Sequence, residues 1–132
     1  MYLADRDPGR AYLPGDDPAA RAGYYQWIFW AMDTVGPLVH PVYLRWFMTA
    51  DDQKASVASD AERAAMDRVL APVAAALVGR PFLLGDRLTA ADVILGGVLQ
   101  WCEAAGLLAG TPVVREYHER LRGRPAYQRA LA

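Results

Sequence analysis

The stretch that decides the fold spans residues 85–95 and reads Gly85-Asp86-Arg87-Leu88-Thr89-Ala90-Ala91-Asp92-Val93-Ile94-Leu95. It is typical of a tight turn followed by the start of a helix. Thr89 is a suitable N-cap, because its hydroxyl can accept a hydrogen bond from an amide of the first helical turn. Asp92 can accept one in return from the Thr89 amide, and its charge suits the positive end of the helix dipole. Leu88 and Val93 occupy the two positions of a hydrophobic staple.

The helix that begins here is apolar on nearly every side. It is expected to run from Ala90 to about Leu108, and its apolar residues are Val93, Ile94, Leu95, Val98, Leu99, Trp101, Cys102 and Leu107. A helix that is apolar all round belongs in the middle of a domain. We therefore expect a buried central helix with the other elements packed around it.

Length and composition indicate one ordinary globular domain. The chain has 132 residues, of which 54% are hydrophobic and 22% charged, and it is long enough to bury a core. A net charge of -1 gives no electrostatic case for binding nucleic acid or an anionic membrane. The single cysteine, Cys102, excludes an internal disulfide and fits a reducing compartment. With no signal peptide and no apolar run of about 18 residues, a cytoplasmic location is expected.

Apolar periodicity predicts helices along the rest of the chain, and no run alternates with the period of a strand. A long aromatic helix is expected from Pro18 to about Phe47, with a kink at Gly36-Pro37 and Pro41. Further helices are expected at residues 61–78, 111–123 and 124–131, and a polar loop at residues 49–60. The predicted fold is all-α, a bundle of about five helices around the central one.

The aromatic helix carries apolar residues on two opposite faces. One face, made by Tyr24, Trp27, Ile28, Ala31, Val35 and Leu38, is explained by the core of the domain. Phe29 and Trp30 fall on the far side and flank a polar stripe that includes Asp33. They require either a second surface (another domain, a subunit or a ligand) or burial in the same core. Both explanations stay open for Phe29, Trp30 and Asp33.

Residue spacing reveals no catalytic constellation. His40 and His118 lie far apart without a partner at metal-ligand spacing, so a metal site is not expected. The sequence has no Cys-x-x-Cys, no nucleophile elbow, no phosphate-binding loop and no dinucleotide fingerprint. Cys102 belongs to the buried helix, where a thiol is kept neutral. Spacing alone therefore indicates a helical bundle with a surplus aromatic surface.

Four segments, in this order and at these spacings, resemble the C-terminal helical domain of cytosolic glutathione transferases. Residues 85–92 look like the capping box and staple that precede the central helix of that domain. Tyr2-Leu3-Ala4-Asp5 resembles the end of the last helix in the thioredoxin-like N-terminal domain, and residues 21–27 the opening of the next helix. Residues 124–131 are similar to the closing segment. The resemblance implies an upstream helix remnant with a linker at residues 1–15 and the helical domain at residues 16–132.

The resemblance also implies a function for the chain. In this family glutathione and the catalytic Ser, Tyr or Cys lie mainly in the thioredoxin-like domain, which this chain lacks. The helical domain supplies most of the pocket for a hydrophobic electrophile and part of a homodimer interface. The chain alone is therefore expected to bind no cofactor and to be inactive, with glutathione as co-substrate of the full-length enzyme. The implied pocket residues are Phe29, Trp30, Asp33, Val39 and Tyr43 on the first long helix and Trp101 on the central helix.

Two alternatives to the transferase remain. Related helical domains serve as non-catalytic adaptors, and the aromatic surface would then be a protein interface. A degraded remnant would fold poorly, because its apolar face has lost its cover. An apolar residue commonly precedes the Tyr-Leu-Ala-Asp segment in the family, so we expect Met1 to be an internal residue of a longer transferase.

Overall fold

The structure, a computed structural model, describes residues 2–7, 9 and 11–131. Its elements in chain order are α1 (Tyr2–Arg6), α2 (Pro18–Phe29), the π-helical segment η1 (Trp30–Val35), α3 (Gly36–Met48), the 3-10 helix η2 (Asp51–Ser56), α4 (Asp60–Ala76), α5 (Ala90–Ala104), α6 (Pro112–Arg122) and α7 (Pro125–Leu131). Across the described residues the only β-type pairing is an isolated bridge between Phe82 and Gly85. The all-α prediction is therefore confirmed. None of the described helices combines the length and apolarity needed to cross a bilayer.

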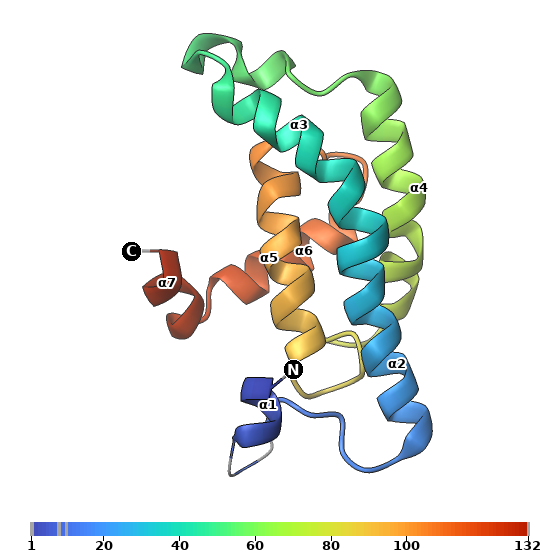
Figure 1. Ribbon diagram of the computed structural model, residues 1–132. Coiled ribbons are helices and arrows are strands. Elements are labelled where there is room, and N and C mark those ends of the chain that lie inside the picture. Colours follow the sequence, from blue (N-terminus) through green and yellow to red (C-terminus); the bar gives the residue numbers. More distant parts are fainter. Residues whose placement is uncertain (1, 8, 10, 132) are drawn as a thin grey trace.

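One long rod is formed by α2, η1 and α3, which follow each other without a break (Figure 1). The predicted kink at Gly36-Pro37 is instead a widened turn. The Gly36 amide donates to the carbonyl of Ala31, five residues earlier, so the turn before Pro37 has π-helical geometry. The helix then continues through Pro41. Counted with this rod, α4, α5, α6 and α7 give the predicted five-membered bundle, and the predicted polar loop contains η2.

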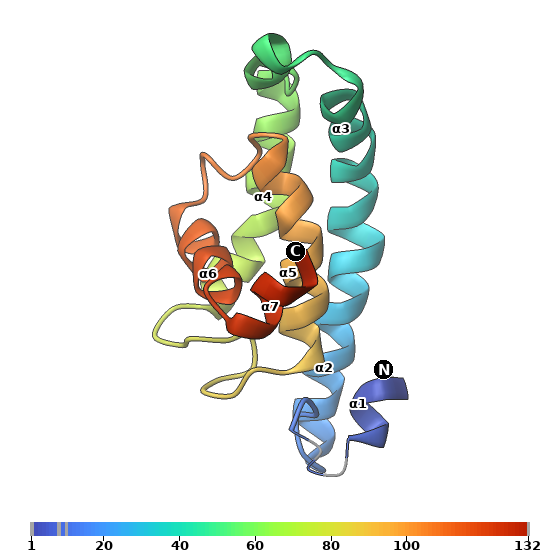
Figure 2. The ribbon, with the colours of Figure 1, turned by 90° about the vertical axis from the view of Figure 1, so that its left-hand side faces the viewer.

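The central helix of the bundle is α5, as predicted. It packs against α2, η1, α3 and α6, and it lies between the rod and α6 (Figure 2). Leu95, Leu99 and Cys102 on this helix are fully buried. It ends at Ala104, earlier than expected, and Gly106 follows with a positive φ of 70°. Burial of its apolar side chains therefore places α5 in the core of the bundle.

The N-terminal segment packs on the bundle. The side chains of Ala4 and Leu13 are buried, and the Ala90 amide donates to the carbonyl of Tyr12 at 2.9 Å. This hydrogen bond ties the segment to the first turn of α5. Met1, discussed above as an internal residue, and two residues of the predicted linker, Pro8 and Arg10, lie outside the described residues.

A buried carboxylate joins three parts of the chain at the start of α5. Asp92 Oδ2 accepts hydrogen bonds from the Thr89 amide at 2.8 Å and the Thr89 hydroxyl at 2.9 Å. Asp92 Oδ1 accepts from the Leu83 amide at 2.9 Å and the Tyr117 hydroxyl at 2.8 Å. Asp92 is fully buried, so these four donors replace its hydration. Burial, and then the charge of Asp92, raises the pKa of Tyr117 well above its usual value.

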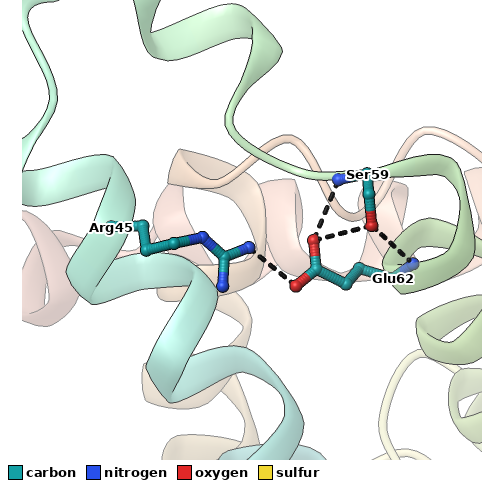
Figure 3. A network of polar contacts seen from close by, with 3 residues as sticks. All are labelled: Arg45, Ser59 and Glu62. Carbon is teal, nitrogen blue, oxygen red and sulfur yellow. Dashed lines mark hydrogen bonds and ion pairs between the residues drawn. The ribbon is translucent and has the colours of Figure 1, made fainter.

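A second capped helix start, at α4, escaped the sequence analysis. The Ser59 hydroxyl accepts from the Glu62 amide at 3.3 Å, and Glu62 Oε2 accepts from the Ser59 amide at 2.9 Å. Figure 3 shows Arg45 of α3 reaching the same carboxylate, with an N–O distance of 2.6 Å. The Ser59 amide, followed by Arg45, lowers the pKa of Glu62 to about 2. These contacts fix the start of α4 beside the end of α3.

Two adjacent glycines on α5 offer a matched test of the packing. A Cβ at Gly96 would lie 2.9 Å from Leu121 Cδ1 of α6, whereas a Cβ at Gly97 would meet nothing within 4 Å. Glycine costs a helix interior about 0.5–1 kcal/mol relative to alanine, and overpacking costs roughly 1–3 kcal/mol. We expect Gly97→Ala to raise the free energy of unfolding by about 0.5–1 kcal/mol and Gly96→Ala to lower it by roughly 1 kcal/mol. Urea unfolding followed by circular dichroism measures both, and equal effects would contradict this packing.

Candidate functional site

An apolar groove runs along α5, between α1 and α7. Its volume is about 650 Å³, within the range typical of small-molecule sites. Figure 2 looks toward this face, with α7 in front of α5 and α1 below it. The apolar part of the lining consists of Leu3, Ala4, Tyr12, Leu88, Ala90, Val93, Ile94, Gly97, Trp101, Leu121, Ala126 and Ala130. The groove is therefore assembled from both ends of the chain and from the central helix.

The helix α7, which forms one wall of the groove, is attached to the bundle by Tyr127 and by Gln128, whose amide donates to the Arg122 carbonyl of α6. The Tyr127 hydroxyl donates to Gln100 Oε1 of α5 at 3.2 Å and lies 3.4 Å from His118 Nε2 of α6. Because the tyrosine proton is used on Gln100, we assign the Nε2–H tautomer to His118, so that this nitrogen donates to the tyrosine. Burial, followed by the charge of Arg122, lowers the pKa of His118 to about 4. The histidine is therefore neutral at pH 7.

Three aromatic rings form a stack, and only the first of them, Trp101, lines the groove. Trp101, which lines it, lies against Tyr43 of α3 with ring centres 5.6 Å apart and an angle of 23° between the planes. Tyr43 lies in the same way against Trp46, at 5.5 Å and 21°. The Lys54 ammonium is 4.6 Å from the centre of the Trp46 ring and 2.6 Å from Asp51. The stack holds the Trp101 indole in place while 37% of that residue stays exposed.

The structure brings together only part of the predicted pocket. Of the six residues, Tyr43 and Trp101 are in contact, and Trp101 alone lines the groove. The positions of the other four are as follows: Val39 is fully buried in the core, Trp30 is half-buried with its indole N–H donating to the Val69 carbonyl at 3.3 Å, and Phe29 and Asp33 are exposed. The helical wheel placed Trp30 on the uncovered side of the rod. It is covered because η1 packs against both α4 and α5.

The staple residues of the opening motif also belong to this site. Leu88 is half-buried and Val93 is 55% exposed, and both line the groove. Apart from Trp101 and the capping residues Leu88, Asp92 and Val93, the sequence analysis singled out none of the groove residues, and those it missed include Gly97, Gln100, Arg124 and Tyr127. The one available signal was the Gly96-Gly97 pair inside an apolar helix, because glycine costs helix stability and marks a place where side chains are excluded.

Neither a reactive cysteine nor a metal ligand set accompanies the groove in the described part of the chain. Cys102 is fully buried, and burial raises the pKa of its thiol to about 12. At neutral pH this sulfur is a thiol and not the reactive thiolate. Among the described residues, no group of three or more His, Cys, Asp or Glu side chains has an arrangement suited to a metal ion. The groove lining, which is mostly apolar, can hold and orient a molecule through apolar contacts.

Residues 56–120 match the family described as glutathione S-transferase, C-terminal domain. The chain is 30% identical over 132 residues to the disulfide-bond oxidoreductase YfcG of Escherichia coli K12, covering 99% of this chain and 59% of that protein. It is 31% identical over 135 residues to glutathione S-transferase GstA of Escherichia coli O157:H7, covering 100% and 63%. The chain thus spans about three fifths of the length of these relatives.

A solved structure shares the fold. A glutathione transferase from Burkholderia graminis, determined with two glutathione molecules bound per subunit, superposes with a TM-score of 0.74 at 25% identity, covering 98% of this chain and 55% of that one. The family match, the two relatives and the shared fold together make this chain similar to glutathione S-transferases, and the match falls on the C-terminal domain of that family.

Proposed function

We propose that this chain is the co-substrate half of a glutathione transferase. It would hold an apolar electrophile beside the thiolate of glutathione, while a thioredoxin-like domain supplies the glutathione site. The observation that carries this proposal is the apolar groove of about 650 Å³ with a fixed, partly exposed Trp101 in its wall. A concave, mostly apolar site with few polar groups is what an electrophile of low polarity requires.

The role of this chain in the reaction is positioning. Holding two reactants at attack distance turns a bimolecular step into an effectively unimolecular one. The Trp101 ring, backed by Tyr43, provides a flat apolar surface on which an electrophile can rest. The apolar lining excludes water from that side of the molecule. Thiolate formation would be the task of the thioredoxin-like domain, because Cys102 is buried and protonated.

Two further surfaces are proposed for protein partners. The thioredoxin-like domain would pack on the exposed apolar residues of the groove lining, which include Leu3, Tyr12 and Val93. The exposed Phe29 and Met32 on the rod would contact a second copy of the complete protein. Covering these side chains would remove apolar area from water, which stabilises association. The adaptor alternative is not favoured, because no described feature selects it. A cytoplasmic location remains a prediction.

The proposal is tested by fusing the chain to the thioredoxin-like domain of a bacterial glutathione transferase. With glutathione and chlorodinitrobenzene, we expect turnover from the fusion and none above buffer from the chain alone. Trp101→Ala in the fusion should raise KM for the electrophile about tenfold, since it removes the flat wall of the groove. Val113→Ala, at an exposed apolar residue of α6 outside the groove, is the control and should leave KM unchanged. Turnover by the isolated chain would contradict the proposal that the thioredoxin-like domain supplies the glutathione site. An unchanged KM for Trp101→Ala would contradict the proposal that the groove holds the electrophile.

A further inference from the structure

We infer that a second site, separate from the groove, binds the zwitterion of an apolar amino acid. This site, the α6 pocket, is an open pocket between α6 and the turn that follows α4, which lie on the same side of the bundle in Figure 2. Its volume is about 370 Å³, at the small end of the range for small-molecule sites. It shares no lining residue with the groove along α5, so the inference is independent of the proposed transferase function.

Arg120 of α6 supplies a positive charge that the fold holds in place. Its Nη2 atom donates to the Pro81 carbonyl at 3.4 Å, and both residues line the α6 pocket. The guanidinium carbon also lies 6.0 Å from the centre of the Tyr117 ring. A guanidinium has five N–H donors, and that of Arg120 forms no ion pair within the described part of the chain. The remaining donors suit a carboxylate, which can accept two of them at once.

Glu116 restricts which anions the α6 pocket can hold. It lines the pocket four residues before Arg120, so the two side chains project from the same face of α6. Opposite charges at this spacing attract each other, yet neither side chain takes part in an ion pair among the described residues. The pocket therefore offers a carboxylate and a guanidinium to a ligand. A plain anion is repelled by Glu116, whereas a zwitterion can pair with both groups.

The turn after α4 supplies the opposite wall of the α6 pocket. Leu77 and Pro81 give this wall apolar surface, and Arg80 adds a second guanidinium to the lining. The Arg80 amide donates to the Leu77 carbonyl at 3.1 Å, and Gly79 between them has a positive φ of 68°. This hydrogen bond and the left-handed glycine hold the turn in one shape. An aliphatic side chain of a bound amino acid would pack on Leu77 and Pro81, whose side chains carry no polar atom.

The experiment compares leucine with two analogues on the purified chain. Isocaproate is leucine without its ammonium group, and isoamylamine is leucine without its carboxylate. NMR titrations give the dissociation constants, and the backbone amides whose signals shift locate the site. We expect leucine to bind about fivefold more tightly than either analogue, which is the effect of one partly exposed ion pair. The signals of Gly79, Arg80 and α6 should shift, and shifts confined to α5 would overturn the inference.

Inorganic phosphate is the fourth probe, because it is an anion without an ammonium group or an apolar part. We expect it to bind about fivefold more weakly than leucine, since Glu116 repels it. Phosphate that binds as tightly as leucine would make the α6 pocket a plain anion site. Isocaproate that binds as tightly as leucine would mean that Glu116 takes no part, and equal binding of isoamylamine would mean the same for Arg120. Each of these three results would overturn the inference.

Variants assign the two charges. Glu116→Gln should remove the advantage of leucine over isocaproate, and Arg120→Gln should remove its advantage over isoamylamine. Glu119→Gln and Arg115→Gln are the matched controls, because they make the same substitutions at exposed residues of α6 outside the pocket, and both should bind leucine like the original chain. Arg120→Lys keeps the charge without the planar fork and should keep part of the advantage. If Glu116→Gln and Arg120→Gln bind all probes like the original chain, while urea midpoints show every variant folded, the inference is wrong.

Discussion

Replacement of Asp92 by alanine is expected to lower the free energy of unfolding by about 3–5 kcal/mol. The substitution removes the acceptor for the amides of Thr89 and Leu83 and for the hydroxyl of Tyr117, all at 2.8–2.9 Å. A buried donor without a partner costs about 1–3 kcal/mol, and the site of Asp92 is fully buried. A capping role alone would cost only about 0.5–2 kcal/mol.

Urea unfolding at pH 7 measures this loss. Tyr117→Phe should cost about 1.5–3 kcal/mol, because it deletes one hydrogen bond to a charged group and leaves the other three in place. The double variant should cost less than the sum, and the difference gives the coupling between the two residues. Asp52→Ala, at an exposed carboxylate of η2, is the control and should change stability by no more than about 0.5 kcal/mol.

Two results of this series would revise the account. If Asp92→Ala lowers the free energy of unfolding by only about 0.5–2 kcal/mol, as the loss of an ordinary cap does, the hydrogen bonds to Leu83 and Tyr117 add nothing to stability. A broad, non-cooperative transition of the original chain would favour the degraded remnant over a folded domain.

The comparison of sequence and structure at this carboxylate shows what local patterns can predict. Thr89 and Asp92 are three residues apart, so their contact follows from helix geometry alone. Leu83 and Tyr117 lie nine and 25 residues from Asp92, and no periodicity reveals that the fold brings them there. The same reasoning explains why burial of α5 was predictable from its composition. Its neighbours on each face depend on how the other helices pack.

The candidate site was less predictable than the fold for two physical reasons. A helical wheel gives the direction of each side chain, but which directions are covered depends on packing, and here η1 packs against both α4 and α5. Trp30, for which a second surface and burial in the core both stayed open, donates to the Val69 carbonyl of α4. The groove itself is built from α1, α5 and α7, which are brought together only by tertiary folding. Of its lining, residue reasoning and resemblance together identified Trp101 as a site residue.

The stability of the chain is expected to fall as the pH is lowered from 6.5 toward 4, through the titration of His118. This side chain is fully buried, and its Nδ1 atom has no hydrogen-bond partner among the described residues. Burial, and then the charge of Arg122, lowers its pKa to about 4 from an ordinary value of 6.5. Between these two values the unfolded chain binds a proton that the folded chain does not. The free energy of unfolding therefore falls as the pH is lowered through this range. The contribution of His118 to it is fully present only above pH 6.5.

The difference between the two pKa values of His118 corresponds to about 3 kcal/mol in all, of which about 2 kcal/mol is lost by pH 5. Urea unfolding between pH 7.5 and 5 isolates this residue, because the lowered pKa of Glu62 acts only below about pH 4.5. His118→Gln should flatten the pH dependence, since its amide still donates to Tyr127 but does not titrate. His40→Gln, at an exposed histidine, is the matched control and should keep the original slope. If His118→Gln also keeps it, the buried histidine is not the source, and the attachment of α7 to the bundle through Tyr127 does not depend on a neutral imidazole.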